Sequence, residues 1–251
     1  MASQDKQPPK YQRIADGLKR AIAAGEYGPG DRLPGENELM AQHGVARMTA
    51  RQALGVLRSE GLAEARKGAG VYVRAFQPIR RRGVPRLAHE HWGAGRSVWS
   101  ADVPDRELVV EGVAVGEEPA AEDVAAGLGA EPGDPVCVRR RTFVLDGKPV
   151  MLATSYLPAA LVAGTRITRP DTGPGGVYAR LAELGAAPVR FREEVRSRMP
   201  TREEAERLRV PAGTPVIRIT RTALAENGHP VEVNEMTLDS SAYVLEYDFD
   251  A

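Results

Sequence analysis

Arginine and glutamine side chains stand at helical spacing between Ala46 and Leu57, in the stretch A-R-M-T-A-R-Q-A-L-G-V-L. Its apolar residues fall at i, i+3, i+4 and i+7 and share one helix face: Ala50, Ala53, Leu54 and Leu57. Arg47, Arg51 and Gln52 lie off that face. In a DNA major groove, Arg reads guanine and Gln reads adenine. The stretch predicts either a DNA-reading helix or an ordinary surface helix with a basic face.

The segments before this stretch favour the DNA-reading alternative. Tyr11–Ala24 carries apolar residues at helical spacing and is followed by a turn, Y-G-P-G-D-R-L-P, in which Pro and Gly prevent the helix from continuing. Glu36–His43 predicts a short helix with acids in its first turn and Gly44 as its end. The order helix, helix, tight turn, helix is that of a helix-turn-helix.

The segment after the stretch predicts a hairpin of two short strands, Leu62–Val73, L-A-E-A-R-K-G-A-G-V-Y-V. Gly68 and Gly70 permit a tight turn, and Arg66 and Lys67 stand at its tip. A basic hairpin after a recognition helix can reach phosphates or the minor groove as a wing. The alternative is a hairpin that only closes the domain.

Residues 11–73 resemble the winged helix-turn-helix of the GntR family of bacterial transcription regulators. The matching segments are G-D-R-L-P-G-E-N-E-L, G-V-A-R-M-T-A-R-Q-A-L, L-R-S-E-G-L and K-G-A-G-V-Y-V. The resemblance and the helix face together give an expected DNA-binding set: Asn37, Arg47, Thr49, Arg51, Gln52, Lys67 and Gly68. Two residues depart from the family pattern. Asn37 stands where Arg is common, and Ala46 where a capping Ser or Thr, worth about 1 kcal/mol, is usual.

The whole sequence of 251 residues suits a globular protein and excludes several classes. One cysteine, Cys137, excludes an internal disulfide, and no zinc-cluster spacing occurs among the four histidines. His89-x-His91 is either a metal pair or a solvated loop pair. No apolar run approaches the roughly 20 residues needed to cross a bilayer, and the polar residues 1–10 lack a signal-peptide core. We expect a cytoplasmic protein with a disordered lead, no cofactor, no metal and no membrane partner.

Charge is divided unequally along the chain. Residues 1–86 hold 16 of the 34 Lys and Arg and 8 of the 34 Asp and Glu, a formal charge of +8, so residues 87–251 carry −8. A basic first third favours a polyanionic partner at one end. We expect a disordered lead over 1–10, a winged helix-turn-helix over 11–76, a linker over 77–97 and a second domain over 98–251. The basic run Arg80–Arg82 in the linker is either solvated or in contact with the DNA backbone.

An internal repeat defines the second domain. Residues 122–142 align with 202–222, so that Arg141 corresponds to Arg221, and each copy runs into a hairpin turn, D-G-K-P-V or N-G-H-P-V. Each repeat therefore predicts a helix, a turn and a strand hairpin. A further helix is expected over 176–184 and a strand over 190–199. Two copies side by side form one antiparallel sheet with helices on it, an α+β domain.

Residues 100–247 resemble the UTRA effector-binding domain, which marks the HutC branch of the GntR family. The motifs are D-G-K-P-V, T-S-Y-L-P, G-G-V-Y-A-R-L, A-G-T-P-V-I-R-I-T-R-T, G-H-P-V-E-V-N and Y-V-L-E-Y-D-F. The resemblance implies a domain that binds small acids, sugars or phosphosugars. It also implies a homodimer formed through this domain.

The candidate effector site combines a strand arginine with a glycine-rich loop. The loop precedes a helix, so its N–H groups and the helix N-terminus could hold an anion, and the resemblance adds Arg141 and two residues of the last hairpin and strand. The expected effector-binding set is Arg141, Asp171, Thr172, Gly173, Gly175, Gly176, Glu232 and Tyr243. For each residue a purely structural role is the alternative. Phe143 and Ala153 replace residues that are often Arg and Glu in the family, which favours a less anionic or partly apolar effector.

Two other functions are conceivable for these residues. Ser155, His229 and Glu232 could form a hydrolytic set, but no nucleophile-elbow, P-loop or zinc-helix pattern accompanies them. A small-molecule carrier with an adaptor domain is the second alternative. The residues favour a non-enzymatic, sequence-specific transcription regulator, a repressor that a small effector releases from a palindromic operator.

Overall fold

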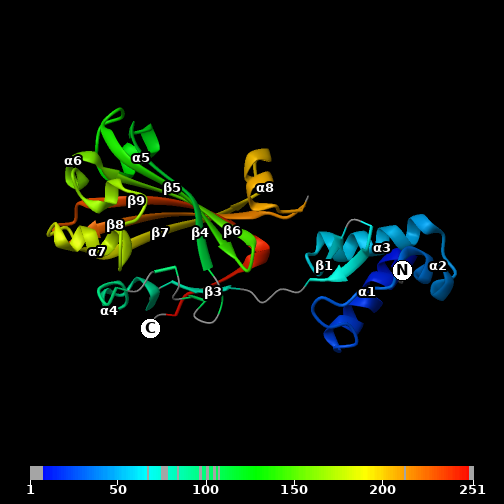
Figure 1. The fold of residues 1–251 in the computed structure, drawn as a ribbon. Helices are drawn as coiled ribbons and strands as arrows, with labels where there is room; N and C mark the ends of the chain where they lie inside the picture. The colour runs from blue at the N-terminus through cyan, green and yellow to red at the C-terminus, as the bar shows by residue number, and fades with distance from the viewer. Residues whose placement is uncertain are drawn as a thin grey trace, which may run out of the picture. The chain divides into compact units, whose positions relative to one another are not determined.

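The computed structural model describes residues 8–66, 68–74, 79–83, 85–95, 98–99, 102–103, 106, 108–211 and 213–248. The chain divides into two compact units, Met1–Gln77 and Pro78–Ala251 (Figure 1). Most of the expected disordered lead lies outside the described residues, and the first helix begins at Lys10. The two units are an N-terminal winged helix-turn-helix and an α+β domain with an antiparallel sheet, as predicted.

Unit 1 contains three helices followed by a hairpin. The elements are α1 (Lys10–Ala23), α2 (Glu36–His43), α3 (Arg47–Ser59), β1 (Ala63–Arg66) and β2 (Gly70–Val73), with β1 and β2 antiparallel. Gly44 ends α2 in the left-handed conformation, at φ 59°, and Ala46 is the N-cap of α3. The core contains the predicted apolar face of α3, packed against residues of α1, α2 and the hairpin: Ile14, Leu18, Leu39, Ala50, Ala53, Leu54, Leu57 and Val73.

Unit 2 is built on a sheet in which, among the described residues, six strands run in the order β4-β5-β6-β9-β8-β7. All of its pairings are antiparallel. The strands are β4 (Leu108–Pro119), β5 (Pro135–Leu145), β6 (Lys148–Pro158), β7 (Pro188–Arg198), β8 (Val216–Ala225) and β9 (Pro230–Asp239). Asp146 and Gly147, both with positive φ, form the two-residue turn between β5 and β6, as the predicted D-G turn requires.

The internal repeat is visible as two hairpins joined at the centre of the sheet, β5-β6 and β8-β9, with β6 against β9. Helix α5 (Glu122–Leu128) leads into the first hairpin and α8 (Arg202–Leu208) into the second. The structure adds β4 before α5, and the strand expected over 190–199 is β7, which stands in the same place before α8. Each half of the domain is therefore a strand, a helix and a hairpin.

The sheet has different coverings on its two faces (Figure 1). Helices α5 and α8 pack on one face, against Val136, Val138, Val233 and Val216. The other face carries α6 (Ala159–Val162), α7 (Gly176–Glu183) and a second hydrophobic cluster that includes Trp92, Tyr178 and Leu181. Arg139, Arg141, Arg221 and Glu232 stand on this second face, because side chains alternate along a strand.

The structure differs from the expected linker over 77–97. Strand β3 (Ile79–Arg82) pairs in parallel with β10 (Tyr243–Glu246), and η1 (Pro85–Leu87) and α4 (His89–Trp92) follow it in unit 2. Ile79 and Arg81 are buried whereas Arg80 and Arg82 are exposed, the alternation of a strand with one face inward. The basic run is therefore a strand of unit 2 and not an irregular linker, and its exposed Arg80 and Arg82 side chains pair with Glu246.

Candidate functional site

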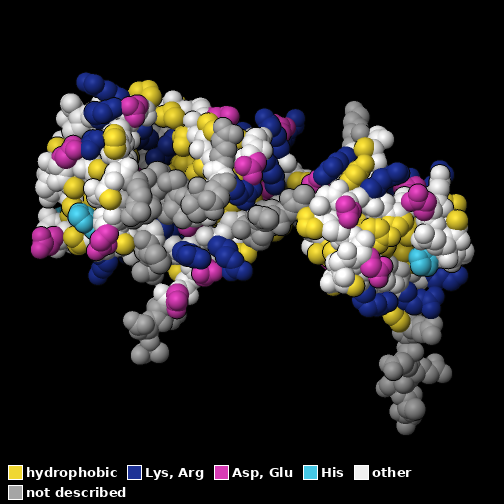
Figure 2. Space-filling model, turned by 60° about the horizontal axis from the view of Figure 1, so that its bottom comes forward, with side chains coloured by type: hydrophobic (Ala, Val, Ile, Leu, Met, Phe, Trp, Pro, Cys, Tyr) yellow, Lys and Arg dark blue, Asp and Glu magenta, His cyan; other side chains and the backbone are white. Residues whose placement is uncertain are grey.

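The exposed face of α3 carries the side chains that the sequence singled out. Arg47, Arg51 and Gln52 are exposed, Thr49 is half-buried, and Asn37 is exposed on α2. Figure 2 shows Lys and Arg in several groups on the visible face of unit 1, with single Asp and Glu side chains between them. A helix whose apolar side is buried and whose Arg and Gln side is free to enter a groove fits a recognition helix.

The arginines of α3 are held by surface contacts with α2. Arg51 Nε lies 2.7 Å from Glu36 Oε1, and Arg47 Nη2 donates to Asn37 Oδ1 at 3.0 Å. The hydrogen bond from Arg51 lowers the pKa of Glu36. Because both arginine side chains are 60% exposed, these contacts belong to the class of surface pairs worth about 0–1 kcal/mol. DNA phosphates or base edges can therefore replace them at little cost.

The hairpin tip is the second element of this candidate interface. Gly68 is exposed at the tip with φ +74°, a left-handed conformation that favours glycine. Lys67 lies outside the described residues. Arg66 stacks over the Tyr72 ring at 4.3 Å and lies 3.1 Å from Glu64. The predicted DNA-binding residues that the structure describes thus lie on α2, α3 and this hairpin, all in unit 1.

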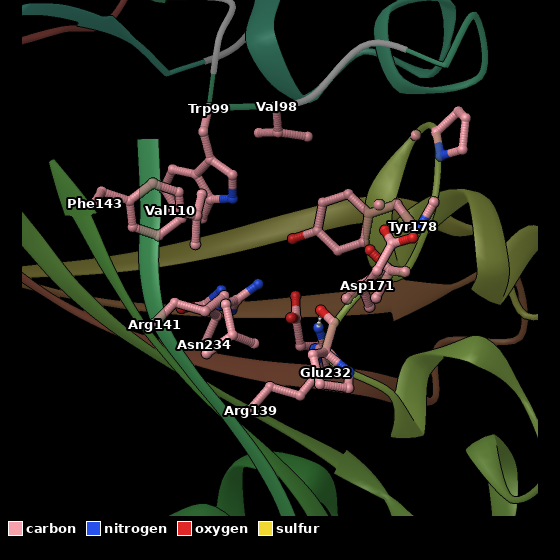
Figure 3. Close-up of a pocket in the computed structure, with 18 of the residues that line it drawn as sticks. Val98, Trp99, Val110, Arg139, Arg141, Phe143, Asp171, Tyr178, Glu232 and Asn234 are labelled. Carbon is pink, nitrogen blue, oxygen red and sulfur yellow. Dashed lines mark hydrogen bonds between the residues drawn. The ribbon is translucent and has the colours of Figure 1, made fainter. Parts of the chain in front are cut away.

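Unit 2 contains a cavity of about 560 Å³ on the second face of the sheet. Figure 3 shows Arg139, Arg141, Asn234 and Glu232 on the strand side of the cavity and Val98 and Trp99 opposite them. The lining combines charged groups on the sheet with apolar and aromatic groups above and beside it: Val98, Trp99, Val110, Val113, Phe143, Pro170, Pro174, Val177 and Tyr178. A mostly apolar cavity with a few polar groups is the usual form of a small-molecule site.

Arg141 reaches the cavity from the middle of β5. Its Nη2 donates to Ser155 Oγ, which also accepts from Asn234 Nδ2 at 3.1 Å. Its Nε is buried without a hydrogen-bond partner among the described residues. Burial lowers the pKa of Arg141, and the nearby Glu232 carboxylate opposes that effect. A buried guanidinium with an unsatisfied N–H is a site for an acceptor that the protein does not supply.

Glu232 on β9 is the complementary group. Its side chain is 2% exposed, and its Oε2 has no hydrogen-bond partner within the described residues. Burial raises the pKa of the nearby Tyr178 phenol, and the Glu232 charge raises it further. A buried carboxylate oxygen without a donor is costly unless a ligand supplies one.

Arg139 has a different role from Arg141 although both lie on the same strand face. Its Nη1 donates to the carbonyls of Ile167 and Arg169, and its Nη2 donates to the Pro170 carbonyl at 3.0 Å. Burial lowers the pKa of Arg139 to about 10. The side chain thus fastens the 167–170 segment to the sheet, and both terminal nitrogens are already occupied.

Arg221 is the repeat counterpart of Arg141 and is also committed within the protein. Its Nε lies 2.8 Å from Glu193 Oε1, and its Nη1 donates to the Tyr178 hydroxyl at 3.2 Å. Arg81 of β3 binds the same carboxylate, with Nη1 3.0 Å from Oε2. Burial raises the pKa of Glu193, but the two arginines outweigh it and bring the pKa to about 2.

The glycine-rich loop before α7 forms one rim of the cavity, and three of its amides are occupied. Asp171 is exposed and pairs with Arg166 at 2.6 Å. The Gly173 N–H donates to Asp171 Oδ1 at 2.8 Å, Gly175 N–H to the Gly95 carbonyl at 3.0 Å, and Gly176 N–H to the Gly173 carbonyl at 3.1 Å. These three N–H groups of the predicted anion cradle are therefore already bonded within the protein, whereas the part of the prediction that concerns the N-terminus of α7 stays a prediction.

Trp99 covers the cavity on the side opposite the sheet. Its ring centroid lies 4.6 Å from that of Phe143, and the guanidiniums of Arg86 and Arg221 lie 5.0 and 5.6 Å from its centroid. Arg86 is itself buried beside Asp102, at 3.3 Å, and burial lowers its pKa to about 9. The indole is therefore held between an aromatic ring and two cations.

The structure brings most of the sequence-predicted effector residues to this cavity: Arg141, Asp171, Thr172, Gly173, Gly175, Gly176 and Glu232. It does not bring Tyr243 there. Tyr243 lies opposite Ile79 in the β10–β3 pair and packs near Trp99, Asp102 and Met151 in a separate small space. The prediction for Tyr243 did not include the parallel pairing of β10 with β3, which fixes its position.

Several cavity residues were not predicted, and some left a signal in the sequence. Arg139 stands two residues before Arg141 on one strand, so alternation places both on one face. Arg221 occupies the position of Arg141 in the second repeat. Asn234 follows Glu232 by two residues on β9 in the same way. Trp99 left no signal, because it precedes the sheet and comes from a stretch without periodicity.

Two side chains of the hydrolytic alternative, Ser155 and His229, have different surroundings. Ser155 Oγ accepts hydrogen bonds from Arg141 and Asn234, and His229 is exposed in the turn between β8 and β9.

His89, the first residue of the possible metal pair, packs edge-on against Trp92, with ring centroids 4.6 Å apart. Within the described part of the chain, no group of three or more His, Cys, Asp or Glu could hold a metal ion. No helix in that part is long and apolar enough to cross a membrane.

Comparison with known families assigns both units. Residues 10–73 match the family described as bacterial regulatory proteins, gntR family, and residues 105–244 match the UTRA domain. The two matches correspond to the unit with the exposed Arg and Gln helix and to the unit with the cavity.

Individual relatives extend over nearly the whole chain. The HTH-type transcriptional regulator SCO4628 of Streptomyces coelicolor is 31% identical, covering 96% of this chain and 93% of the relative. The HTH-type transcriptional repressor NagR of Bacillus subtilis is 29% identical, covering 89% and 88%. The crystal structure of PhnF from Mycobacterium smegmatis superposes with a TM-score of 0.57 at 27% identity, covering 95% and 99%.

Proposed function

The chain belongs to the GntR family of bacterial transcription regulators that carry a UTRA domain, and from this premise we propose that it is a repressor released from its operator by a small effector. The observation that carries the proposal is the cavity of unit 2, where buried Arg141 and Glu232 both have unpartnered atoms. The relative NagR is named a repressor, which supports repression rather than activation as the role of this protein.

DNA recognition is assigned to unit 1. Arg47, Arg51 and Gln52 of α3 would read base edges in the major groove. Asn37, Thr49, Lys67 and Gly68 would contact phosphates or the minor groove and fix the position of the helix. Because such a protein acts on the bacterial chromosome, its place is the cytoplasm.

A homodimer formed through unit 2 would place two such helices on one operator. One recognition helix reads too few base pairs for selectivity, and a two-fold dimer matches a palindromic site. The protein would then act by binding alone, with no enzymatic step. The arrangement around Ser155 supports this, since its hydrogen-bonding partners are Arg141 and Asn234.

The proposal is tested by selecting the full-length protein's binding sites from random double-stranded DNA. We expect a short palindrome, bound at least roughly 1,000-fold more tightly than scrambled DNA at physiological salt. Enrichment of no sequence, or equal binding of selected and scrambled DNA, would contradict a sequence-specific regulator. The DNA upstream of the gene itself provides an independent second test with the same palindrome.

A further inference from the structure

We propose that the effector is a small organic acid with one carboxylate, a hydroxyl group beside it and an apolar, ring-bearing body, and that it is not a sugar phosphate. This inference rests on the proposed effector role of the unit 2 cavity. It follows from which polar groups of the cavity are already bonded within the protein and which are not.

The first step concerns the acidic group of the ligand. Of the three described arginines that line the cavity, Arg139 has both terminal nitrogens on main-chain carbonyls, and Arg221 is bonded to Glu193 and Tyr178. Arg139 and Arg141 each keep a buried Nε without a partner among the described residues, but Arg139 is fastened by three main-chain carbonyls whereas Arg141 donates to Ser155. One guanidinium satisfies a carboxylate in a two-pronged contact.

A phosphate group suits this cavity less well than a carboxylate as the main anchor. A phosphate ester carries about −1.5 to −2 charges and three strong acceptor oxygens, so its burial needs several donors. The usual donors at such a place are loop amides, but those of Gly173, Gly175 and Gly176 are bonded to Asp171 or to carbonyls. Arg166 near the loop pairs with Asp171. Three loop amides and Arg166 are therefore already bonded within the described residues and do not serve a phosphate.

The third step concerns the hydroxyl group. Glu232 Oε2 and Asn234 Oδ1 are buried beside the cavity without a donor among the described residues, and the Arg141 and Glu232 side chains enter the same space from neighbouring parts of the sheet (Figure 3). A ligand that bonds Arg141 and also donates to Glu232 satisfies both groups. A neutral hydroxyl fits better than an ammonium group, because Arg139 and Arg141 already place two cations beside the single Glu232 carboxylate.

The fourth step concerns the body of the ligand. Trp99, Phe143 and Tyr178 present aromatic rings to the cavity, and Val98, Val110 and Val113 add aliphatic surface. A sugar ring carries hydroxyl groups that would be left without partners on this side. An apolar, planar body buries its surface there instead, and aromatic pairs add to the gain.

Isothermal titration calorimetry of the full-length protein with four probes tests the inference. 3-Phenyllactate has the carboxylate, the hydroxyl and the ring, 3-phenylpropanoate lacks the hydroxyl, phenylalanine replaces it with an ammonium, and lactate lacks the ring. Glucose 6-phosphate is the competing class. We expect 3-phenyllactate to bind most tightly, and 3-phenylpropanoate to bind roughly 10- to 100-fold more weakly, the range for a hydrogen bond to a charged group.

Two variants assign the contacts. Arg141→Gln should abolish binding of every acid, whereas Glu232→Gln should bring the affinities of 3-phenyllactate and 3-phenylpropanoate within threefold of each other. Arg140→Gln and Glu235→Gln are matched controls. Arg140 is next to Arg141 and Glu235 follows Glu232 by three residues, and both lie on the opposite sheet face, paired with Glu118 and Arg218. The controls should keep the wild-type affinities. Circular dichroism checks that each variant is folded.

Tighter binding of glucose 6-phosphate than of the acids, lactate binding equal to 3-phenyllactate, or no binding of any acid would overturn the inference. A Glu232→Gln protein that keeps the full preference for 3-phenyllactate would overturn the hydroxyl contact. These failures are distinguishable from failure of the proposed function, because operator selection uses the protein without ligand. If glucose 6-phosphate released the protein from its operator, the proposed regulator function would stand and the proposed hydroxy-acid effector would be wrong.

Discussion

Arg221 Nε lies 2.8 Å from Glu193 Oε1, and the Glu193 carboxylate also binds Arg81. Arg221 lines the cavity, whereas Arg81 belongs to β3, the strand that opens unit 2. The Arg81 and Arg221 side chains are each 1% exposed and that of Glu193 is 9% exposed. The Glu193 carboxylate thus connects a cavity-lining arginine to β3, the first strand of unit 2.

This buried network predicts acid sensitivity of unit 2. The folded-state pKa of Glu193 is about 2, below the ordinary value of 4.5. A carboxylate whose pKa is lower in the folded than in the unfolded protein stabilises the fold at pH values above the unfolded-state pKa. This contribution, about 3 kcal/mol in total, is lost as the pH falls from about 4.5 to about 2. Urea unfolding followed across that pH range measures it.

Glu193→Gln is the matching variant. We expect it to lose about 3–5 kcal/mol at neutral pH, because two buried arginines lose their partner, and to lose most of the pH dependence between 4.5 and 2. Glu194→Gln, the next residue along and exposed, should do neither. An unchanged pH profile in Glu193→Gln would show that other carboxylates cause the acid sensitivity.

The glycine-rich loop gives a prediction about packing. Gly175 has φ +76°, and a Cβ on it would lie 2.5 Å from the Ala179 Cβ and 2.6 Å from the Trp92 carbonyl oxygen. Gly176 has φ +67° but no atom within 4 Å of the same position. Both substitutions to Ala cost about 1–2 kcal/mol for the left-handed backbone. Gly175→Ala should cost a further 1–3 kcal/mol, roughly, for overpacking.

Denaturant unfolding of Gly175→Ala and Gly176→Ala measures that difference directly. Since the backbone contribution is common to both variants, only the contacts with α7 and Trp92 distinguish them. Equal stability of the two variants would mean that the loop moves away from α7 without cost.

Variants of unit 1 should distinguish side chains that read base edges from side chains that contact phosphates. Arg51→Ala should lose about 1–3 kcal/mol of binding to the selected operator and relax sequence preference, as expected for a base-reading arginine. Lys67→Ala should weaken operator and scrambled DNA alike and reduce the salt slope by about one. Mobility-shift titrations at several salt concentrations measure both, and identical behaviour of the two variants would refute the assignment.

The proposed dimer is tested by sedimentation. Equilibrium runs at micromolar concentration, with and without the palindromic operator, should give twice the chain mass of 27.1 kDa for the protein component. A single chain under both conditions would contradict the two-fold arrangement on DNA.

The sequence predicts those parts of the structure that local pattern determines. The 3.6-residue spacing over 50–57 identifies the buried face of α3, and the alignment of Arg141 with Arg221 identifies two halves of one sheet. It does not predict the pairing of Ile79 with Tyr243, because these residues are far apart in the sequence and parallel pairing leaves no local signal. The expected linker failed for that reason.

The candidate site likewise has some features that the sequence predicts and others that it does not. Alternation along β5 and β9 places Arg141 and Glu232 on one sheet face. Whether a given arginine stays available for a ligand depends on partners elsewhere in the chain. The carbonyls of Ile167, Arg169 and Pro170 occupy both terminal nitrogens of Arg139, whereas Arg141 donates to Ser155 and faces no such segment; the Nε of each is unpartnered among the described residues. No sequence pattern distinguishes these two residues.

The central claim is that a ligand at Arg141 weakens DNA binding by unit 1. Such a ligand must bind the DNA-incompetent state more tightly than the competent one, because equal affinity shifts nothing. Typical coupling of 1–3 kcal/mol corresponds to roughly a 5- to 150-fold loss of operator affinity. By reciprocity, operator DNA must weaken ligand binding by the same factor.

The most direct measurement is fluorescence anisotropy of labelled operator DNA titrated with wild-type, Arg141→Ala and Arg140→Ala protein, with and without the tightest-binding compound from the calorimetric series. We expect the compound to weaken operator binding by wild-type and Arg140→Ala protein about 5- to 150-fold. Arg141→Ala should bind the operator with wild-type affinity and give no response to the compound. Release of Arg141→Ala from the operator at the same compound concentration as wild type would contradict the account.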